Sequence, residues 1–306
     1  MYIAKITQNY PDIAFQEIQE LFEDVTLLTP THVFFTTQNP SFFSRLAFTN
    51  TIYQIISTDY QPIQLPSTEY KIEFEKKSPI NKERAFEYIY YAMPEPIINL
   101  NKPKDIFYFF TATAQEKQIL YCTKQIYTNQ KTFLERKPQL RIAKHPSSID
   151  PRLARAMVNL AGKKAHAIYD PFCGTGGILL EAFDCQLQTI GSDIDPHMIE
   201  KSQQNCKQFH ANVTLFTGDA LKQTTQSDAI VTDLPYGKNT RILDNIQHLY
   251  EQFLKREYEK TNRIVLCTPS FIPTQKIIER TQWNISFKSQ FYVHKNLNRV
   301  IYLLTK

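Results

Sequence analysis

All seven glycines of this 306-residue chain lie between Gly162 and Gly237. Seven is about a third of the usual share for a chain of this length, so most of its turns are made without glycine. Such a chain keeps glycine where the backbone needs a positive φ angle or where another group approaches closely. Because these glycines stand beside acidic residues at the ends of predicted strands, the sequence indicates a ligand site in this part of the chain.

From Asp150 onward, predicted strands and helices alternate, which is typical of a parallel sheet with helices on both faces. A helix over residues 151–160 begins with proline, which is favoured in the first turn, and a longer helix is predicted over residues 243–259. The predicted strands cover residues 165–169, 188–192, 213–217, 229–232, 263–267, 285–293 and 299–304. The sequence therefore predicts an α/β domain over residues 150–306.

The first 130 residues have the pattern of two small α+β units, which Pro62 and Pro66 separate. Their predicted strands and helices cover residues 2–7, 12–22, 25–28, 32–37, 70–74, 81–92, 106–112 and 119–123. We therefore expect four segments along the chain, namely two small domains, a basic linker and the α/β domain, over residues 1–60, 61–130, 131–149 and 150–306.

Between Lys117 and Lys144 the chain carries seven basic residues and only one acidic residue, Glu135. Tyr121, Tyr127 and Phe133 are interleaved with these bases, and mixed basic and aromatic content suits a nucleic-acid backbone. A solvated linker of no specific function would have the same charge pattern. The charge alone does not decide between the two interpretations.

The composition excludes several classes of protein. With 42% hydrophobic residues the chain is not disordered, and no run approaches the roughly 18 apolar residues of a membrane span. The first residues do not have the form of a signal peptide. The five cysteines form no Cys-x-x-Cys pair, and His145 and His294 have no metal-ligand spacing. We expect a cytoplasmic protein in a reducing compartment, without bound metal and without membrane contact.

Four consecutive predicted strands end in polar signatures. The first is followed by a glycine-rich turn, Asp170-Pro-Phe-Cys-Gly174-Thr-Gly176-Gly177, and the next two end near Asp193 and Asp219. The fourth ends in Asp233-Leu-Pro-Tyr236. Ligands of open α/β sheets bind at the carboxyl ends of the strands, where Asp193 could accept from ribose hydroxyls and Asp219 from an adenine amine.

Each carboxylate also has a purely structural interpretation. Asp193 and Asp219 could be ordinary helix caps, and Asp233 could be a buried acid satisfied by backbone amides. Cys173 has no adjacent base and is interpreted as a small packed residue.

These signatures resemble those of the class I S-adenosylmethionine-dependent methyltransferases. Asp233-Leu-Pro-Tyr236 is similar to the Asp/Asn-Pro-Pro-Tyr motif of enzymes that methylate exocyclic amines, with Leu234 replacing the first proline. Residues 141–161 and 294–299 resemble segments of the tRNA guanine-N2 methyltransferase family that acts on position ten. Residues 62–130, including 98–103, resemble its THUMP domain, and residues 1–60 occupy the place of its N-terminal ferredoxin-like domain.

The resemblance implies a Rossmann-like seven-stranded domain that uses S-adenosylmethionine to add one or two methyl groups to a guanosine N2 amine of tRNA. No protein partner is identified from the sequence, and we expect the protein to be active alone. The catalytic residues would be Asp233, Leu234, Pro235 and Tyr236. The cofactor-binding residues would be Asp170, Phe172, Gly174, Thr175, Gly176, Gly177, Asp193, Ile194, Asp219, Ala220 and Asp233. The RNA-binding residues would be Lys117, Lys124, Lys131, Arg136, Lys137, Arg141, Lys144, Lys238 and Arg241.

The expected mechanism follows from the weak nucleophilicity of a ring-conjugated amine. The Asp233 carboxylate and the Leu234 carbonyl would accept the two amine hydrogens, and Tyr236 would stack on a flipped-out guanine. The alternatives are methylation of another tRNA or rRNA position, methylation of adenine in DNA, and a non-catalytic RNA-binding protein that keeps the fold. A dehydrogenase would leave the Asp-Leu-Pro-Tyr segment without a role.

Overall fold

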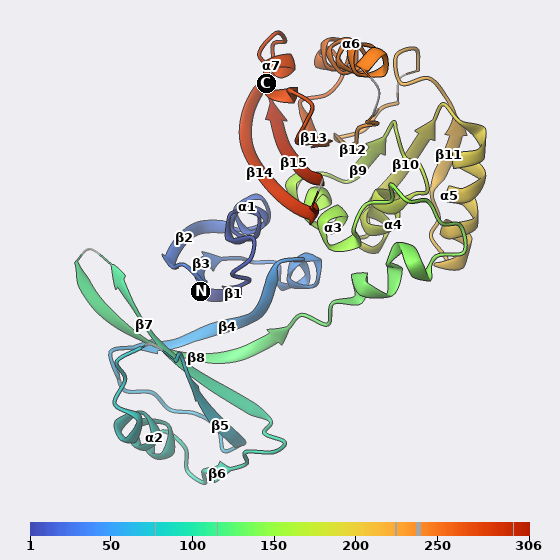
Figure 1. Ribbon diagram of the computed structural model, residues 1–306. Helices are drawn as coiled ribbons and strands as arrows, with labels where there is room; N and C mark the ends of the chain where they lie inside the picture. Colours follow the sequence, from blue (N-terminus) through green and yellow to red (C-terminus); the bar gives the residue numbers. More distant parts are fainter. Residues whose placement is uncertain (77, 115, 224, 237–239, 296) are drawn as a thin grey trace. The chain divides into compact units, whose positions relative to one another are not determined.

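The chain forms two compact units in a computed structural model that describes residues 1–76, 78–114, 116–223, 225–236, 240–295 and 297–306. The first unit contains residues 1–44 and 48–130, and the second contains residues 45–47 and 131–306. Figure 1 shows both units coloured along the sequence. Within the described residues, no helix is both long enough and apolar enough to cross a membrane.

The first unit is built on one eight-stranded sheet, in the order β2-β3-β1-β4-β8-β7-β5-β6. Its elements are β1 (Tyr2–Ile6), α1 (Pro11–Leu21), β2 (Glu23–Thr29), β3 (His32–Thr36), β4 (Thr49–Thr58), β5 (Glu69–Phe74), α2 (Lys82–Tyr91), β6 (Ile97–Ile98), β7 (Asp105–Ala114) and β8 (Lys117–Thr128). Asn81 caps α2, because its side chain accepts a hydrogen bond from the Arg84 amide at 3.0 Å.

Strand β4, which the sequence did not predict, joins the two halves of this sheet. It pairs antiparallel with β1 on one side and with β8 on the other, from Thr51 opposite Thr128 to Thr58 opposite Tyr121. The predicted domains over residues 1–60 and 61–130 therefore share one sheet and, apart from residues 45–47, one compact unit. The structure corrects the expected domain boundary at residue 60, because a boundary there would cut through this sheet.

The second unit contains a seven-stranded sheet in the order β11-β10-β9-β12-β13-β15-β14, as the alternating pattern predicted. Its strands are β9 (Ala167–Asp170), β10 (Gln188–Asp193), β11 (Thr214–Thr217), β12 (Ala229–Asp233), β13 (Arg263–Pro269), β14 (Asn284–His294) and β15 (Leu297–Thr305). The first five are parallel, and β15 runs antiparallel between β13 and β14. The strand order reverses between β9 and β12, which opens a crevice at their carboxyl ends.

Helices cover both faces of this sheet (Figure 1). They are α3 (Pro151–Leu160), α4 (Gly177–Asp184), α5 (Pro196–Gln208), α6 (Thr240–Tyr258) and α7 (Thr274–Ile278). The central strand β13 has four consecutive side chains that are fully buried, from Ile264 to Cys267. Such a continuous apolar run is typical of a parallel strand that is covered on both faces. Tyr250, Phe253 and Leu254 of α6 pack in the same core.

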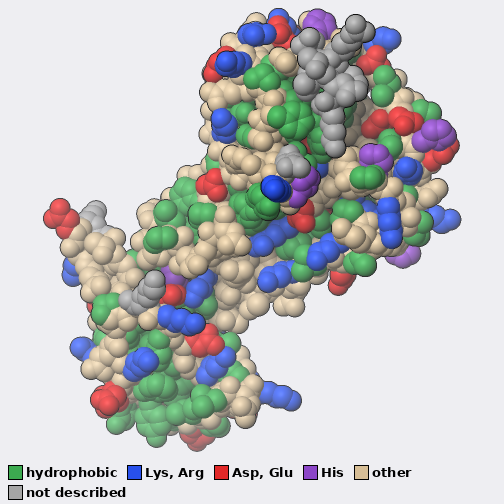
Figure 2. Space-filling view, in the orientation of Figure 1, with side chains coloured by type: hydrophobic (Ala, Val, Ile, Leu, Met, Phe, Trp, Pro, Cys, Tyr) green, Lys and Arg blue, Asp and Glu red, His purple; other side chains and the backbone are tan. Residues whose placement is uncertain are grey.

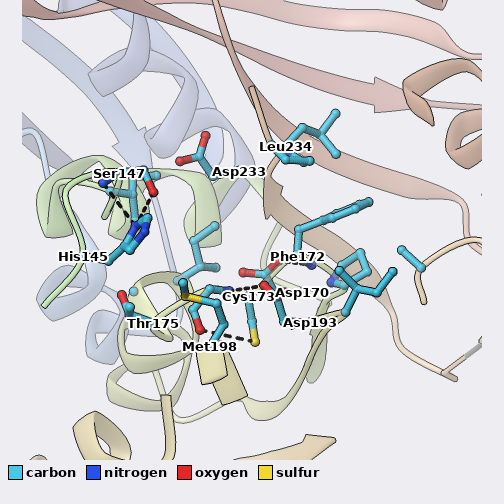
Figure 3. Close-up of a pocket in the computed structure, with 18 of the residues that line it drawn as sticks. His145, Ser147, Asp170, Phe172, Cys173, Thr175, Asp193, Met198, Asp233 and Leu234 are labelled. Atoms are coloured by element: carbon cyan, nitrogen blue, oxygen red, sulfur yellow. Dashed lines mark hydrogen bonds between the residues drawn. The ribbon is translucent and has the colours of Figure 1, made fainter. Parts of the chain in front are cut away.

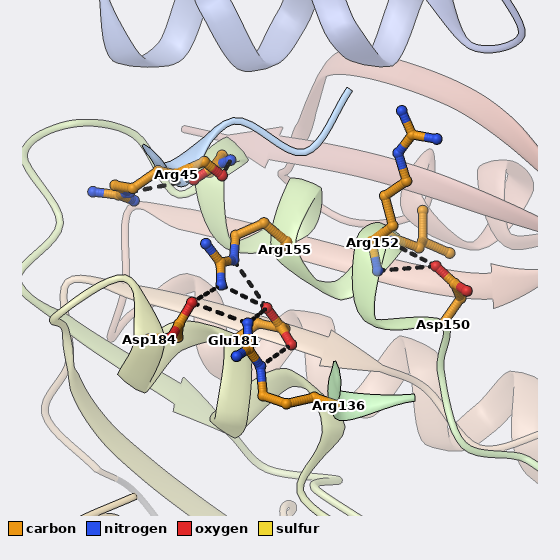
Figure 4. A network of polar contacts seen from close by, with 9 residues as sticks. Arg45, Arg136, Asp150, Arg152, Arg155, Glu181 and Asp184 are labelled. Atoms are coloured by element: carbon orange, nitrogen blue, oxygen red, sulfur yellow. Dashed lines mark hydrogen bonds and ion pairs between the residues drawn. The ribbon is translucent and has the colours of Figure 1, made fainter. Parts of the chain in front are cut away.

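The predicted linker over residues 131–149 is a packed part of the second unit, which corrects its interpretation as a solvated linker. It begins with two short 3₁₀ helices, η2 (Thr132–Arg136) and η3 (Pro138–Leu140). Phe133 is only 2% exposed, and Arg136 is 7% exposed. Arg136 forms ion pairs with Glu181 at 2.7 Å and Asp184 at 2.9 Å, and Arg155 binds the same two carboxylates (Figure 4).

Candidate active site

A cavity of about 470 Å³ opens at the carboxyl ends of β9, β10 and β12. It unites almost all of the residues that the sequence singled out for the cofactor and the reaction (Figure 3). The predicted residues that line it are Asp170, Phe172, Gly174, Thr175, Gly177, Asp193, Ile194, Asp219, Ala220, Asp233, Leu234, Pro235 and Tyr236.

Gly176 is the one predicted cofactor residue that does not line this cavity. It precedes α4 with a φ angle of +81°, and a Cβ atom placed there would lie 2.6 Å from the Ser202 Oγ of α5. Gly176 is therefore required for the close packing of the turn against α5. Gly174, with φ +52°, has nothing within 4 Å of an added Cβ and faces open space.

Asp193 holds the glycine-rich turn in place at the end of β10. Its carboxylate accepts hydrogen bonds from the Gly174 amide at 2.9 Å and from the Asp195 amide at 3.0 Å. Burial raises the pKa of Asp193, and the hydrogen bonds from these amides oppose that rise. Asp195, and not Asp193, caps α5, so the interpretation of Asp193 as an ordinary helix cap is wrong.

Asp219 lies beyond the end of β11 and offers a second carboxylate to the cavity. One of its oxygens accepts from the Leu221 amide at 2.9 Å, and the other lies 3.5 Å from the exposed Lys222 ammonium. Asp193 and Asp219 thus stand on neighbouring strands, where they can accept from hydroxyl or amine donors of a ligand.

Asp170 ends β9 and is almost entirely buried, with 2% of its surface exposed. The Thr232 hydroxyl donates to it at 2.7 Å and the Phe172 amide at 3.1 Å. Burial raises its pKa to about 8, although both hydrogen bonds act in the opposite direction. Asp170 therefore fixes the start of the turn and ties β9 to β12.

The Asp233–Tyr236 segment leaves the sheet at the end of β12 and is held by its backbone. The Leu234 amide donates to the Cys267 carbonyl at 2.9 Å, and the Tyr250 hydroxyl donates to the Pro235 carbonyl at 2.7 Å. The Leu234 side chain is fully buried in the core. Leucine in place of proline thus fills a core position, and the position of the backbone is set by these two hydrogen bonds.

Arg299 of β15 organises the reactive end of this segment. Its Nη2 atom lies 3.1 Å from the Asp233 Oδ2 atom and donates to the Tyr236 hydroxyl at 2.6 Å and to the Ser147 carbonyl at 2.9 Å. Burial raises the pKa of Asp233 to about 6, and the Arg299 charge opposes this rise. Burial likewise raises the pKa of Tyr236 to about 12.

Sequence reasoning missed the loop that forms another wall of the cavity, with His145, Ser147, Ser148 and Ile149 among its lining residues. The His145 Nδ1 atom lies 2.7 Å from the Ser147 hydroxyl, and the Ser148 hydroxyl lies 3.1 Å from that of Thr175. The second contact joins the loop to the glycine-rich turn. The only signal in the sequence was that this loop falls within the family-like segment 141–161.

The structure also corrects the assignment of Arg136 and Arg141 as RNA contacts, because both side chains are buried. Arg136 is paired with carboxylates, and Arg141 is 1% exposed with its Nε donating to the Arg136 carbonyl at 2.9 Å. Neither guanidinium is available to a phosphate in this structure. Lys124 is half-buried and pairs with Asp105 at 2.8 Å.

The remaining predicted RNA contacts divide into two groups. Lys117, Lys131, Lys137 and Lys144 are exposed. Lys238 lies outside the described residues, and Arg241 stands in the first turn of α6, where only the backbone is described. Figure 2 shows Lys and Arg side chains in blue on the visible face of both units, with acidic side chains in red between them.

The five cysteines are all buried and unpaired. Cys173 lies inside the glycine-rich turn at 5% exposure, and burial raises the pKa of its thiol well above the usual value. A thiol of this kind is inert, as its interpretation as a packed residue requires. Over the described ranges of the chain, no group of three or more His, Cys, Asp or Glu residues could hold a metal ion.

Comparison with known proteins identifies relatives that cover more than half of this chain. The chain is 35% identical over 184 residues to a tRNA (guanine(10)-N2)-dimethyltransferase of Methanothermobacter thermautotrophicus, covering 57% of this chain and 54% of that protein. It is 30% identical over 221 residues to the enzyme of the same name from Pyrococcus abyssi, covering 68% of this chain and 64% of that protein. The chain thus spans about half to two thirds of the length of these relatives.

Two solved structures share the fold along the whole chain. TrmN from Thermus thermophilus aligns with a TM-score of 0.51 at 16% identity, covering 100% of this chain and 99% of that one. A possible methylase from Clostridium difficile 630 aligns with a TM-score of 0.51 at 15% identity, covering 99% of this chain and 97% of that one. At such low identity these likenesses concern the fold alone.

Two family models match the sequence. One, described as DNA methylase, matches residues 9–204 and ends before the Asp233–Tyr236 segment. The other, described as the RMKL-like methyltransferase domain, matches residues 138–301, which include six strands of the second sheet, the first part of β15 and every residue that lines the cavity. The chain belongs to this family, that of the RMKL-like methyltransferase domain.

Proposed function

We propose that the protein is an S-adenosylmethionine-dependent tRNA methyltransferase that adds one or two methyl groups to the N2 amine of the guanosine at position ten. The observation that carries the proposal is the position of the Asp233–Tyr236 segment. The segment follows β12 and lines the same cavity as Asp193 and Asp219. A group that could accept hydrogens from a substrate amine and a candidate nucleoside site therefore lie in one cavity. The names of the archaeal relatives support the choice of substrate.

The lining of the cavity fits S-adenosylmethionine. Gly174 presents bare backbone to the cavity, and Asp193 and Asp219 would accept from the ribose hydroxyls and the adenine amine. Phe172 and Ile194 would pack against the apolar parts of the nucleoside. When bound, the cofactor supplies the methyl group to be transferred.

The chemistry assigned to the chain is to hold a weak nucleophile in place. The Asp233 carboxylate and the Leu234 carbonyl accept the two hydrogens of the guanine amine, and Tyr236 stacks on the base. Fixing the nitrogen in line with the methyl group can supply roughly 7 to 11 kcal/mol of the barrier. The base reaches such a pocket only when it is flipped out of its helix, at a cost of a few kcal/mol.

The first unit is proposed to choose the RNA. In this proposal residues 61–130 act as a THUMP-like module and residues 1–60 as a ferredoxin-like segment, and the strands of both belong to one sheet. A single-stranded RNA end suits protein recognition because its bases can be stacked and hydrogen-bonded. Removal of the terminal CCA nucleotides from a folded tRNA should therefore lower methylation sharply, and equal activity on trimmed and intact tRNA would contradict this role.

The test of the proposed function is to incubate tRNA with the protein and labelled S-adenosylmethionine, and to identify the labelled nucleoside by mass spectrometry. Labelled N2-methylguanosine or N2,N2-dimethylguanosine is expected. Asp233→Ala should abolish transfer while cofactor affinity stays near the wild-type value. Asp193→Ala should instead weaken the binding of the cofactor by about 1.5 to 3 kcal/mol, because the substitution removes a charged hydrogen bond.

A second candidate function is methylation of an exocyclic amine in DNA, which the match of residues 9–204 to a DNA methylase model favours. The same assay with double-stranded DNA distinguishes the two functions. Labelled N6-methyladenine or N4-methylcytosine in DNA, without label in tRNA, would replace the tRNA proposal.

A further inference from the structure

Arg299 makes an unusual set of contacts for one nitrogen atom. The residue is 3% exposed, and its Nη2 atom lies within 3.1 Å of three oxygens, two from the Asp233–Tyr236 segment and one from Ser147. An Nη2 atom carries two hydrogens, which go to the Ser147 carbonyl and the Tyr236 hydroxyl. The third oxygen, Asp233 Oδ2, is therefore held mainly by the opposite charge.

This arrangement leaves the other oxygen of Asp233 open. The Oδ1 atom is buried and has no hydrogen-bond partner in the part of the chain that the structure describes, although the residue lines the cavity. A buried acceptor without a partner is unfavourable, and native proteins keep one chiefly where a ligand or a catalytic role requires it. The open oxygen thus marks the place where a substrate donor would complete the carboxylate.

The sheet fixes Arg299 at this position. Asp233 stands opposite Cys267 in the β12–β13 pair, and Arg299 stands opposite Pro269 in the β13–β15 pair. Arg299 therefore lies on the strand next but one to β12, at the same edge as Asp233. The sheet therefore fixes the backbone of Arg299, and the contacts to Asp233, Tyr236 and Ser147 hold its guanidinium.

We propose that Arg299 is a positioning residue of the methyl-transfer site, which keeps the Asp233 carboxylate charged and turned so that Oδ1 faces the substrate amine. The same nitrogen sets Tyr236 and the Ser147 loop relative to that carboxylate. The inference rests on the proposed function, because it assigns Asp233 as the acceptor for the amine.

The charge is the part of this role that can be measured separately. Burial raises the pKa of Asp233, and the Arg299 charge is the larger of the two effects that oppose it, the other being a hydrogen bond with the Cys267 thiol. Without that cation the carboxyl group would stay protonated to a higher pH, and a proton on Oδ1 would make that atom a donor in place of the acceptor that the amine needs. Removing a neighbouring opposite charge moves a carboxyl pKa upward by about one to three units.

Four other titratable groups surround Asp233, namely Tyr236, Tyr250, Cys267 and Asp170. Burial raises the pKa of all four, so the two tyrosines and the cysteine stay neutral between pH 5 and pH 9. Asp170, with a pKa of about 8, is the group of this set that also titrates in that range. A comparison of wild type with an Arg299 variant keeps all four groups and changes only the cation beside Asp233.

The experiment measures kcat from pH 5 to pH 9 for the full-length wild type and for Arg299→Gln, with intact tRNA and saturating S-adenosylmethionine. The acid limb of the variant should move to higher pH by about one to three units, while its affinity for S-adenosylhomocysteine stays at the wild-type value. Arg263→Gln is the matched control, because Arg263 lies at the opposite end of β13 and donates to the Leu160 carbonyl. Its acid limb should coincide with that of the wild type.

An unmoved acid limb in a folded Arg299→Gln protein would overturn the inference. If that variant does not fold, Arg299→Lys provides the test, because lysine keeps the charge but cannot reach three oxygens in the same geometry. Its acid limb should stay in place while kcat falls by about 100-fold, the effect of a small misplacement of a reacting group. Wild-type kcat in Arg299→Lys would also overturn the inference. Failure of the proposed function is distinguishable, since the wild type itself would then leave tRNA guanosine unmethylated.

Discussion

Gly174 and Gly176 belong to one motif but serve the site in different ways. Both have positive φ angles, +52° and +81°, which disfavour any residue with a Cβ atom. Gly174 lines the cavity and has free space around it, so its missing side chain leaves room for a ligand. Gly176 lies outside the cavity lining and against Ser202, so its missing side chain leaves room for the protein itself.

This difference predicts unequal effects of two matched substitutions. Gly174→Ala should lower the free energy of unfolding by about 1 to 2 kcal/mol, the cost of left-handed backbone for a residue with a Cβ. Gly176→Ala should lower it further, because the new Cβ would also meet the Ser202 Oγ at 2.6 Å. Unfolding in urea without ligand, followed by the fluorescence of the single tryptophan, Trp283, measures both. Equal losses in the two variants would contradict the packing role of Gly176.

At the level of elements, a buried ion network holds the segment before α3 against α3 and α4. Glu181 of α4 is fully buried between Arg136 of η2 and Arg155 of α3, and Asp184 completes the cluster (Figure 4). A buried network of this kind is weak evidence of net stabilisation, but removal of one member leaves an uncompensated charge.

Glu181→Gln should therefore be strongly destabilising. Two guanidinium groups would lose their buried partner, which costs about 3 to 5 kcal/mol for a buried ion pair. Glu251→Gln is the matched control, because Glu251 pairs with Lys255 and Arg280 on the surface and should change stability little. Trp283 fluorescence during urea unfolding reports on this unit for both variants. A small loss in Glu181→Gln would show that the two arginines find other partners.

In the first unit, strand β3 carries a buried histidine, His32. His32 is 1% exposed, stacks on Phe110 of β7 at 4.3 Å and lies 3.0 Å from the Tyr108 hydroxyl. Burial and the nearby Lys5 ammonium lower its pKa to about 4, although Glu75 opposes them. The histidine is therefore neutral in the folded protein at neutral pH.

This shift predicts a loss of stability in mild acid. Between pH 6.5 and pH 4 the unfolded chain binds a proton at His32 that the folded unit does not bind, so stability falls as pH falls. The slope is about 1.4 kcal/mol per pH unit, or a few kcal/mol over the window. Hydrogen exchange of β1, β3 and β7 amides measures it, and His32→Gln should flatten the dependence. Parallel curves for the two proteins would exclude His32 as the source.

The elements that the sequence predicted correctly are those with a regular local pattern. The seven strands of the second sheet were found because they alternate with helical segments, and four of them also end in a polar signature. β4 was missed because its register shifts twice against β8, near Ile52 and Ile55, which interrupts the alternation of buried and exposed residues. The join between the two predicted small domains was missed with it.

The site was predictable to the extent that its residues share a strand end or a turn. Arg136 and Arg141 were assigned to RNA because their partners and surroundings lie far along the chain, and a charge pattern does not distinguish a buried guanidinium from a solvated one. Arg299 lies in a family-like segment, but its contacts to Ser147 and Asp233 join parts of the chain 152 and 66 residues apart. Only the pairing of β13 with β15 places it at the site.

At the scale of the whole molecule, the net charge of +5 is compatible with a polyanionic partner but does not locate its contacts. Among the predicted RNA contacts of the second unit whose side chains the structure describes, Arg136 and Arg141 are buried and three lysines are exposed, namely Lys131, Lys137 and Lys144. If these contact phosphates, they do so through flexible ammonium groups that release counterions on binding.

Replacement of Lys131, Lys137 and Lys144 by alanine should therefore reduce the salt dependence of tRNA binding. Each phosphate contact contributes about −0.7 to −0.9 to the slope of log affinity against log salt, so three lost contacts should flatten the slope by about two to three. The control is a triple alanine variant of Lys164, Lys207 and Lys276, which are also exposed and remove the same charge. Its slope should equal that of the wild type. Because both variants have the same net charge, equal slopes in the two would mean that only the overall charge matters and that the segment makes no specific phosphate contacts.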